Sequence, residues 1–336
     1  MAKAYKEYGI PVERVPRMSC NDKEAEKRIS NMTPVILTDT NLVTSALKWD
    51  LDYLVDNLGK EDFTVFVSDK RTFKYYDEAK VKEHKLEGFN PPAKREEMKI
   101  WEFAEKLKSG DGKKYYLQQS LNDAVGKNIV KDFLCFNWEW ATKQQSQNSW
   151  GPLTSNLLLI ASKGNITPAH YDEQQNLFGQ LVGQKRFLLF APEQFECLYP
   201  HPVWHPHDRQ SQVDFDHPDL EKFPNFRKLS GYEAILNPGD VLYVPMYWWH
   251  QVESSMQGSY TVSVNFWYKS GPVEKVVYPL MGHQKMAIMR NVEKMLTEAL
   301  KDVNEVSINA IYCFHEICFP YVHFRYHFRL GRYYGH

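Results

Sequence analysis

The sequence predicts a mainly β fold of the jelly-roll or barrel type, with helices at its flanks. From about residue 115, short apolar runs such as SNLLLIAS, QKRFLLFAP and SYTVSVNFWY follow one another, separated by glycine and proline. Helical spacers of the kind that join parallel strands are missing between these runs. Aromatic residues make up 14% of the 336 residues, a share that favours a β-rich core and a substrate groove lined with rings.

Composition narrows the class of protein. The net charge of −1 gives no general electrostatic attraction to nucleic acid or to an anionic membrane. The five cysteines form no CxxC pair, so neither a disulfide framework nor a cysteine zinc site is indicated. The start of the chain lacks an apolar signal region, and no run approaches 18 apolar residues. We therefore expect a soluble intracellular protein with no nucleic-acid or membrane partner.

Before the strand-rich part, strands and helices alternate. The runs 34–39 and 62–69 read as strands, and the segment between them reads as an amphipathic helix that ends at Gly59. The stretch 94–110 reads as a second helix, because its apolar residues fall on one face. After Gly282, the run HQKMAIMRNVEKMLTEALKD predicts a further helix, with methionines and leucines at helical spacing.

A long loop, Pro192 to Gly231, interrupts the strand-rich part. A loop of this length is normally functional or disordered, and this one is rich in aromatic and charged residues. Its histidines suggest zinc, but we expect the prolines among them to prevent a convergent geometry. They are predicted to be solvated or packing residues: His201, His205, His207 and His217.

Two His-x-Asp matches occur, and their surroundings differ. The pair His217 and Asp219 lies in the long loop, and the proline between them argues against a central strand. The pair His170 and Asp172 follows a strand-like run, and residues i and i+2 of a strand point to the same face. We therefore take His170 and Asp172 as candidate metal ligands.

His250 is the candidate for a third ligand. It closes the apolar run VLYVPMYWWH, after a turn at 237–240 that sends the strand across the sheet. Two neutral imidazoles and one carboxylate leave three coordination positions open, which suits non-haem Fe(II) that binds oxygen and a co-substrate together. Spacing alone supports an alternative equally well, in which His170 is a hydrogen-bonded core histidine and His250 a strand-end residue.

Other polar residues favour the metal site. Lys185 shares a strand face with Phe187 and Leu189, and a lysine that points into an aromatic barrel is costly unless it meets an anion. Thr167 offers a hydroxyl to the same anion. A polar stripe on the last strand is formed by Thr261, Ser263, Asn265 and Trp267. Together these residues describe a pocket for a small dicarboxylate, with a solvated edge lysine as the alternative for Lys185.

At these residues the sequence resembles the JmjC-type iron and 2-oxoglutarate oxygenases, and within them the asparaginyl hydroxylases. The likeness runs from about Thr33 to about Val306. It includes the segments TSNLLLI, TPAHYDEQQN, QFECLYP, DRQSQVDFD, GDVLY, PMYWWH, VNFWYK and AIMRN. The resemblance implies a double-stranded β-helix, the jelly-roll of cupin and JmjC domains, with flanking helices and a C-terminal helical element for dimerisation.

The domain organisation follows from the texture and the resemblance together. We expect a polar N-terminal arm, α/β elements that pack on the barrel, the JmjC catalytic core, a C-terminal helical element and an atypical tail. Their respective bounds are 1–30, 31–115, 116–272, 273–306 and 307–336. The tail departs from the family's pattern, and we have no functional account of it.

The resemblance implies a role for each matching residue. Fe(II) is expected on His170, Asp172 and His250. Lys185 is expected to pair with the distal carboxylate of 2-oxoglutarate, the co-substrate used with O2. The other residues expected to bind the co-substrate are Tyr116, Thr167, Asn176 and Asn265. The residues expected to bind the substrate are Tyr75, Gln118, Arg209, Gln210 and Trp267.

The activity implied is oxygen-dependent β-hydroxylation of asparagine, and hence a role in oxygen sensing and the hypoxia response. The implied partners are the C-terminal transactivation segment of hypoxia-inducible factor alpha, ankyrin-repeat proteins and a second copy of the chain, in cytoplasm and nucleus. One alternative is histone lysine demethylation, against which stand the near-zero charge and the absence of a zinc-finger or reader module. A second is a non-catalytic cupin-like binding module, which predicts no consumption of 2-oxoglutarate.

Overall fold

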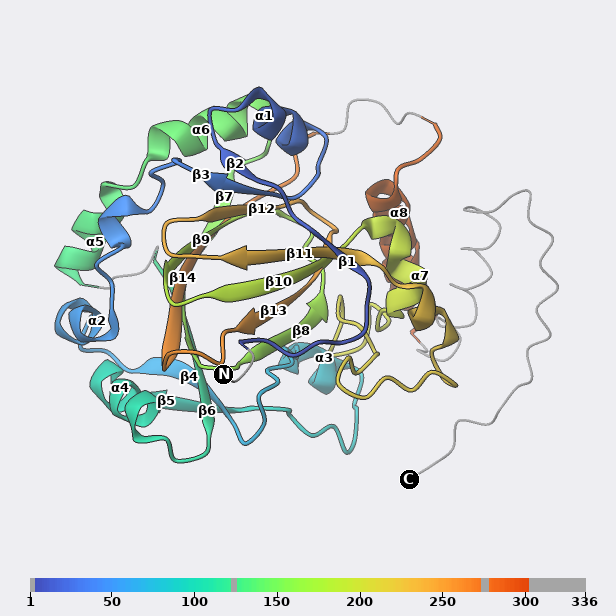
Figure 1. Cartoon of the computed structure of the whole chain (residues 1–336). Helices are drawn as coiled ribbons and strands as arrows, with labels where there is room; N and C mark the ends of the chain where they lie inside the picture. Colours follow the sequence, from blue (N-terminus) through green and yellow to red (C-terminus); the bar gives the residue numbers. More distant parts are fainter. Residues whose placement is uncertain (1–3, 122–125, 273–277, 302–336) are drawn as a thin grey trace. The chain divides into compact units, whose positions relative to one another are not determined.

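The structure is a computed structural model (Figure 1). The residues it describes are 4–121, 126–272 and 278–301. The chain divides into two compact units, residues 1–286 and 287–336. Helix α8 (Gly282–Leu300) begins in the first unit and continues into the second. The tail that the sequence marks as atypical, 307–336, lies outside the described residues.

Two β-sheets form the framework of the first unit. Within the described residues, the smaller sheet has five strands, in the order β1 (Val12–Arg14), β11 (Gly231–Leu236), β10 (Lys185–Phe190), β13 (Trp249–Ser254) and β8 (Ile166–His170). The larger sheet, in the same part of the chain, has nine strands, in the order β2 (Arg17–Ser19), β3 (Val35–Thr38), β12 (Val241–Val244), β9 (Gln175–Val182), β14 (Tyr260–Tyr268), β7 (Leu153–Ser162), β6 (Lys114–Ser120), β4 (Phe63–Ser68) and β5 (Lys94–Met98).

Successive strand residues of the larger sheet point alternately to its two faces. In β7, Leu158 packs into one apolar cluster and its neighbour Leu159 into another. The second cluster lies between the two sheets, where the rings of Phe178 and Phe187 meet edge to face with centroids 4.8 Å apart. This apolar interior between two sheets is the jelly-roll that the sequence predicts, so the predicted fold class is confirmed.

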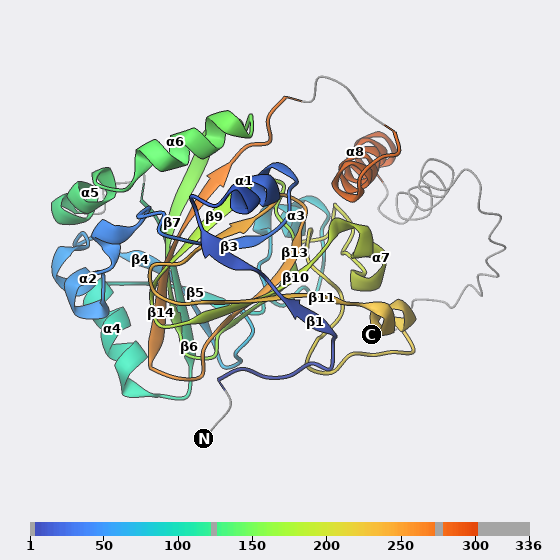
Figure 2. The ribbon, with the colours of Figure 1, turned by 45° about the horizontal axis from the view of Figure 1, so that its top comes forward.

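Helices cover the outer face of the larger sheet (Figures 1 and 2). They are α2 (Leu51–Asn57), α4 (Ile100–Ser109), α5 (Lys127–Leu134) and α6 (Trp138–Gln147). Each contributes to the first apolar cluster, for example through Leu54, Phe103 and Ile129, which are fully or almost fully buried. The remaining short helices are α1 (Lys23–Ser30), α3 (Glu78–Glu83) and α7 (Phe195–Leu198), with 3-10 turns η1 (Thr44–Ala46), η2 (Pro192–Gln194) and η3 (Pro224–Lys228). Of the helices described, none has the length and apolar character needed to cross a bilayer.

The helix predicted over 94–110 is wrong at its beginning. Residues Lys94–Met98 form the edge strand β5, which pairs antiparallel with β4 from Phe63↔Met98 to Val67↔Lys94. The helix α4 begins only at Ile100 and ends at Gly110, whose φ of 64° is in the left-handed region. The charged run KREE satisfies a helical pattern as well as an exposed edge strand, and the free edge of β4 decides between them.

The N-terminal residues, predicted to be a polar arm, contribute short strands to both sheets. β1 pairs parallel with β11, with Val12 opposite Gly231. β2 pairs parallel with β3, with Met18 opposite Leu37. The segment before β1 runs over the outer face of the smaller sheet, where the Tyr8 hydroxyl donates a hydrogen bond to Glu253 Oε1 at 2.5 Å.

Candidate metal centre

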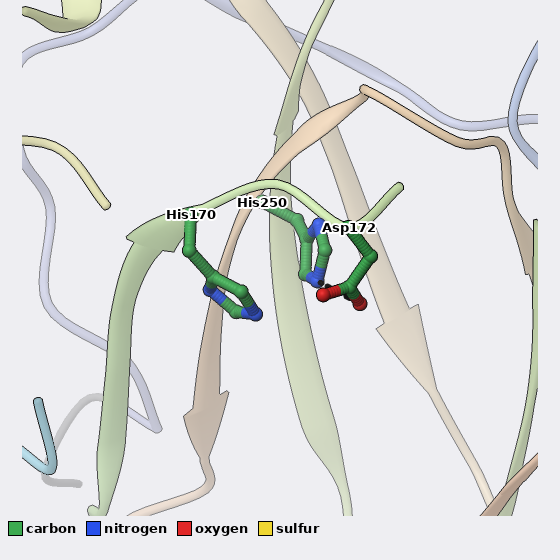
Figure 3. A group of neighbouring side chains, drawn as sticks. All are labelled: His170, Asp172 and His250. Atoms are coloured by element: carbon green, nitrogen blue, oxygen red, sulfur yellow. Dashed lines mark ion pairs between the residues drawn. The ribbon is translucent and has the colours of Figure 1, made fainter. Parts of the chain in front are cut away.

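Two neighbouring strands of the smaller sheet bring two histidines together. His170 is the last residue of β8, and it is the direct partner of His250 in the antiparallel pairing of β8 with β13. Asp172 lies two residues beyond the end of β8, in the loop that leads to β9. The ligand atoms of the three residues lie within 4.8 Å of one another, and Figure 3 shows the side chains converging. The sequence expectation of a single strand carrying both His170 and Asp172 is therefore wrong in detail, because the strand stops at His170.

Backbone carbonyls set the tautomer of both imidazoles. His170 Nδ1 lies 2.8 Å from the carbonyl oxygen of Pro168, and His250 Nδ1 lies 3.0 Å from that of Trp248. A carbonyl oxygen only accepts, so each Nδ1 carries the hydrogen and each Nε2 presents its lone pair. Nε2 of His250 lies 3.9 Å from Asp172 Oδ2. Both rings are thus held with Nε2 available to a ligand site, in the way that outer contacts orient the ligands of metal sites.

Electrostatics favour the charge states that a metal requires. Burial, together with the neighbouring His250, lowers the pKa of His170 to about 4, which keeps its imidazole neutral at pH 7. Burial alone would raise the pKa of Asp172, but the two imidazoles and the guanidinium of Arg209 outweigh it and lower that pKa. Two imidazole nitrogens and one carboxylate oxygen are a donor set that fits Fe(II) of the open, three-ligand kind.

Lys185 is a buried cation in the same interior. Only 2% of the residue is exposed, and its Nζ lies 5.2 Å from the ring centroid of Phe178 and 5.9 Å from that of Tyr116. Among the described residues, none gives this ammonium a hydrogen bond or an ion pair, and burial lowers its pKa to about 7. An isolated charge is costly in such surroundings, so the place is suited to an anion from outside the chain.

Strand register relates Lys185 to the metal ligands. Leu189 of β10 is the partner of His250, and Lys185 lies four residues away on the same face of β10. The backbone separation is about 13 Å, at about 3.3 Å per residue. A long lysine side chain and a five-carbon dicarboxylate together are of the size to fill this interval. Thr167 pairs with Val252 on the same sheet, at a position between Lys185 and the metal ligands.

Hydroxyl and amide groups surround this interval. Burial raises the pKa of Tyr116 to about 12, and the side chains of Thr167 and of Gln118, an exposed residue of β6, partly offset that rise. Asn176 of β9 is buried, and its Oδ1 has no hydrogen-bond partner in the part of the chain that the structure describes. Asn265 of β14 is buried too, and its Oδ1 accepts the backbone N–H of Leu157 at 3.0 Å.

The indole of Trp267 lies on the Asp172 side of the site. Trp267 is the partner of Asn176 in the pairing of β14 with β9. Its N–H lowers the pKa of Asp172, yet it does not reach hydrogen-bond geometry with any described residue. The structure therefore brings Asn176, Trp267 and Asp172 into one neighbourhood from three separate parts of the sequence.

The long loop passes directly beside the metal ligands. Its residues Arg209 to Ser211 run antiparallel to Ala169–Tyr171, with Ser211 N–H donating to Ala169 O at 2.8 Å and Tyr171 N–H donating to Arg209 O at 3.1 Å. The Arg209 guanidinium lies 3.5 Å from Asp172 Oδ1. Gln210 is buried and donates from Nε2 to the carbonyl oxygen of Tyr75 at 2.6 Å.

The histidines of this loop are predicted to be solvated or packing residues. His217 is solvent-exposed, with 86% of its side chain accessible, and neither it nor Asp219 belongs to a convergent ligand group among the described residues. The other three loop histidines pack together, and in the same part of the chain they form no convergent metal-ligand group either. The rings of His201, His205 and His207 lie with centroids 4.1 to 5.5 Å apart, because tight turns at Pro202 and Pro206 fold the loop back on itself.

Some functional contacts left no signal in the sequence. The carbonyls of Pro168 and Trp248, which set the histidine tautomers, belong to the backbone and carry no residue-specific pattern. The same holds for the backbone carbonyl of Tyr75, because the sequence predicts a role only for the side chain of this residue. That side chain is 54% exposed beside the long loop.

Comparison with known proteins finds a family match and several relatives for this chain. Residues 21–274 match the family described as the cupin-like domain. Lysine-specific demethylase 8 of Danio rerio is 31% identical over 271 residues, which cover 77% of this chain and 59% of that protein. HSPB1-associated protein 1 of Homo sapiens is 43% identical over 114 residues, covering 33% and 22%. tRNA wybutosine-synthesizing protein 5 of Homo sapiens is 28% identical over 269 residues, covering 79% and 80%. The chain thus spans 59% of the length of the first of these relatives and 22% of the second.

Proposed function

Since the chain belongs to the family of cupin-like domains, we propose that it is an Fe(II)- and 2-oxoglutarate-dependent oxygenase that hydroxylates asparagine in proteins. One observation carries the proposal: His170, Asp172 and His250 converge in the same barrel interior as the ammonium of Lys185, which has no hydrogen-bond or ionic partner among the described residues. A metal ion held by the three ligands would bind one carboxylate of a small dicarboxylic acid, and Lys185 would bind the other. The relatives' names agree with a group of proteins that modify other macromolecules.

The chain's own residues have separable roles in this reaction. His170, Asp172 and His250 would hold the iron, which when bound activates O2 so that 2-oxoglutarate becomes succinate and carbon dioxide while one oxygen atom enters the substrate. Lys185 neutralises the far carboxylate of the co-substrate. The hydroxyls of Thr167 and Tyr116 hydrogen-bond the same end. The protein accelerates the reaction chiefly by holding these groups in a fixed relative position.

Asparagine is proposed as the target because of the two loop residues beside the ligands. Gln210 already donates its Nε2 to Tyr75, which leaves its carbonyl oxygen to accept an N–H of a target carboxamide. Arg209 supplies guanidinium donors to the carboxamide oxygen. Tyr75 and Gln118, both exposed, would line the groove for the peptide. By resemblance to the asparaginyl hydroxylase called factor inhibiting hypoxia-inducible factor, we propose the hypoxia-inducible factor alpha transactivation segment and ankyrin repeats as substrates.

A second candidate is lysine demethylation, which the name of the zebrafish relative favours. The two chemistries are separated by incubating the protein with Fe(II), 2-oxoglutarate and O2, together with an asparagine-bearing ankyrin peptide or a methylated histone peptide. Mass spectrometry is expected to find one added oxygen atom on asparagine and no loss of methyl groups. Demethylation without hydroxylation contradicts the asparagine proposal. No consumption of 2-oxoglutarate with either peptide favours the non-catalytic binding module.

We extend the proposal to assembly and location. Two apolar residues of α8 are largely or partly exposed, Met295 at 68% and Leu300 at 37%. They support a homodimer formed through C-terminal helices, and light scattering of the full chain with Met295→Lys tests it. An unchanged dimer mass in that variant, or a monomeric wild type, contradicts the proposed interface. Oxygen sensing through a transcription factor further implies a protein of cytoplasm and nucleus.

A further inference from the structure

The middle of the long loop folds into a closed lobe that ends at the substrate side of the site. Pro200 pairs with Ser211, and His201 N–H donates to the carbonyl oxygen of Gln210 at 2.9 Å. Gln210 in turn forms an isolated bridge with His170. The lobe thus delivers Gln210 to the metal ligand while its own histidines face the segment Lys74–Lys80.

The side chains of His207 and Gln210 share one backbone acceptor, the carbonyl oxygen of Tyr75. The carbonyl oxygen of Tyr75 accepts a hydrogen bond from Gln210 Nε2 at 2.6 Å and another from His207 Nδ1, also at 2.6 Å. A carbonyl oxygen has two lone pairs, so these two donors occupy both. The position of the Gln210 side chain therefore depends on a carbonyl that His207 holds from the other side.

His207 is itself held in place by His205. The backbone N–H of His207 donates to His205 Nδ1 at 3.0 Å, and the two ring centroids lie 5.4 Å apart. The ring of His207 also contacts Phe89, with centroids 5.4 Å apart. The chain of contacts runs from His205 through His207 and the Tyr75 carbonyl to the side chain of Gln210.

Further contacts keep the lobe against the same segment. The Lys74 ammonium lies 3.0 Å from His201 Nε2, and Lys80 Nζ lies 2.5 Å from the carbonyl oxygen of Val203 and 2.7 Å from Asp208 Oδ2. These contacts fix the Lys74–Lys80 backbone relative to the lobe. The carbonyl of Tyr75 lies inside this segment, and the lone pair that faces the lobe accepts its hydrogen bond from His207.

We propose that His207, supported by His205, is a positioning residue that sets the orientation of Gln210 toward the target carboxamide. The inference rests on the proposed function, and it adds specificity residues that do not contact co-substrate or metal. Loss of the His207 donor frees one lone pair of the Tyr75 carbonyl and lets that carbonyl and Gln210 shift. The target carbon of the asparagine is then no longer held in the reacting position, whereas 2-oxoglutarate still binds.

The test compares two replacements of His207 in the full-length, iron-loaded protein. His207→Phe keeps a ring against Phe89 but has no donor, whereas His207→Asn places an amide N–H₂ near the position of Nδ1. With an ankyrin peptide, His207→Phe is expected to raise the peptide KM and the ratio of succinate to hydroxyasparagine by about two- to tenfold, the factor of one neutral hydrogen bond. The KM for 2-oxoglutarate stays unchanged. His207→Asn restores coupling toward the wild-type ratio.

Two further variants serve as a control and as a second test of the proposal. His217→Phe, on the exposed histidine of the same loop, is expected to leave both products in their wild-type ratio. His205→Leu removes the acceptor of the His207 N–H, and it serves if His207→Phe fails to fold; it is expected to uncouple in the same direction. Wild-type coupling in a folded His207→Phe or His205→Leu protein overturns this inference alone. A wild-type protein that hydroxylates no asparagine overturns the proposed function, and this inference with it.

Discussion

Lys185 and Arg186 are consecutive residues of β10, and their side chains lie on opposite faces of the smaller sheet. Lys185 points inward over the ring of Phe178 and has no ionic partner among the described residues. Arg186 points outward under the N-terminal segment, where it donates to Glu253 Oε2 at 2.6 Å. Because strand side chains alternate between faces, Lys185 faces the site and Arg186 faces the outer side of the smaller sheet.

Replacing Lys185 is expected to affect co-substrate binding alone. In Lys185→Ala the far carboxylate of 2-oxoglutarate is desolvated without a partner, which costs roughly 2–5 kcal/mol. Steady-state kinetics are therefore expected to show a KM for 2-oxoglutarate at least about tenfold higher, with iron affinity unchanged. Lys94→Ala, on an exposed lysine of β5, is the control. An unaltered KM in Lys185→Ala means that another cation holds the acid.

Co-substrate affinity is expected to depend on pH through the same lysine. Burial lowers the pKa of Lys185 to about 7 in the free protein, and a bound carboxylate raises it again. Binding then takes up one proton above pH 7, so the affinity falls about tenfold per pH unit as the pH rises. Calorimetric titration with 2-oxoglutarate between pH 7 and about 9 measures this slope. Lys185→Arg, which stays charged, is expected to lose it; a flat wild-type profile contradicts the assignment.

Replacing Arg186 is expected to affect stability. Arg186→Met leaves the carboxylate of Glu253, which is 1% exposed, buried without its cation. Breaking such a pair costs about 3–5 kcal/mol, which urea unfolding measures directly. The matched control is Arg14→Met, whose side chain is 72% exposed and whose ion pair with Glu233 contributes at most about 1 kcal/mol. Equal losses in the two variants argue against a special role for the buried pair.

Removing the carboxylate ligand is expected to abolish metal binding and turnover while the barrel still folds. Asp172→Ala deletes the single anionic donor of the convergent group. Loss of a contact that merely supports a metal ligand lowers metal affinity roughly 10- to 100-fold. Loss of the ligand itself is expected to lower the affinity for Fe(II) or Mn(II) by more than that. Calorimetry measures the affinity, and circular dichroism checks the fold. Asp219→Ala, in the exposed pair of the long loop, is expected to change nothing. Inactivation by Asp219→Ala instead would move the metal site to the loop.

Replacing Gln210 is expected to uncouple the two halves of the reaction. Gln210→Ala removes the carboxamide that faces the target asparagine and leaves Lys185 and the metal ligands intact. A small misplacement of the reacting carbon lowers the rate roughly a hundredfold, so hydroxyasparagine is expected to vanish while succinate persists. Both products are quantified from one reaction. An unchanged product ratio would remove the loop from the substrate site.

The sequence alone predicted the fold class from short-range patterns, and it supplied the members of the convergent group as candidates from their spacing together with the family resemblance. Alternation along β10 places Lys185 inward without reference to any other strand. The spacing of His170 and Asp172 brings them to one end of β8, and His250 ends an apolar run that has to join the same sheet. Periodicity of this kind is a property of a few neighbouring residues, so it can be read directly.

Only the tertiary structure decided the features that depend on distant backbone. The helix expected from Lys94 is a strand up to Met98, because the free edge of β4 pairs with it. The tautomer of His250 depends on the carbonyl of Trp248, and the orientation of Gln210 on the carbonyl of Tyr75, 135 residues away in the chain. A backbone carbonyl is the same in every residue, so its position as an acceptor is set by folding and carries no mark in the sequence.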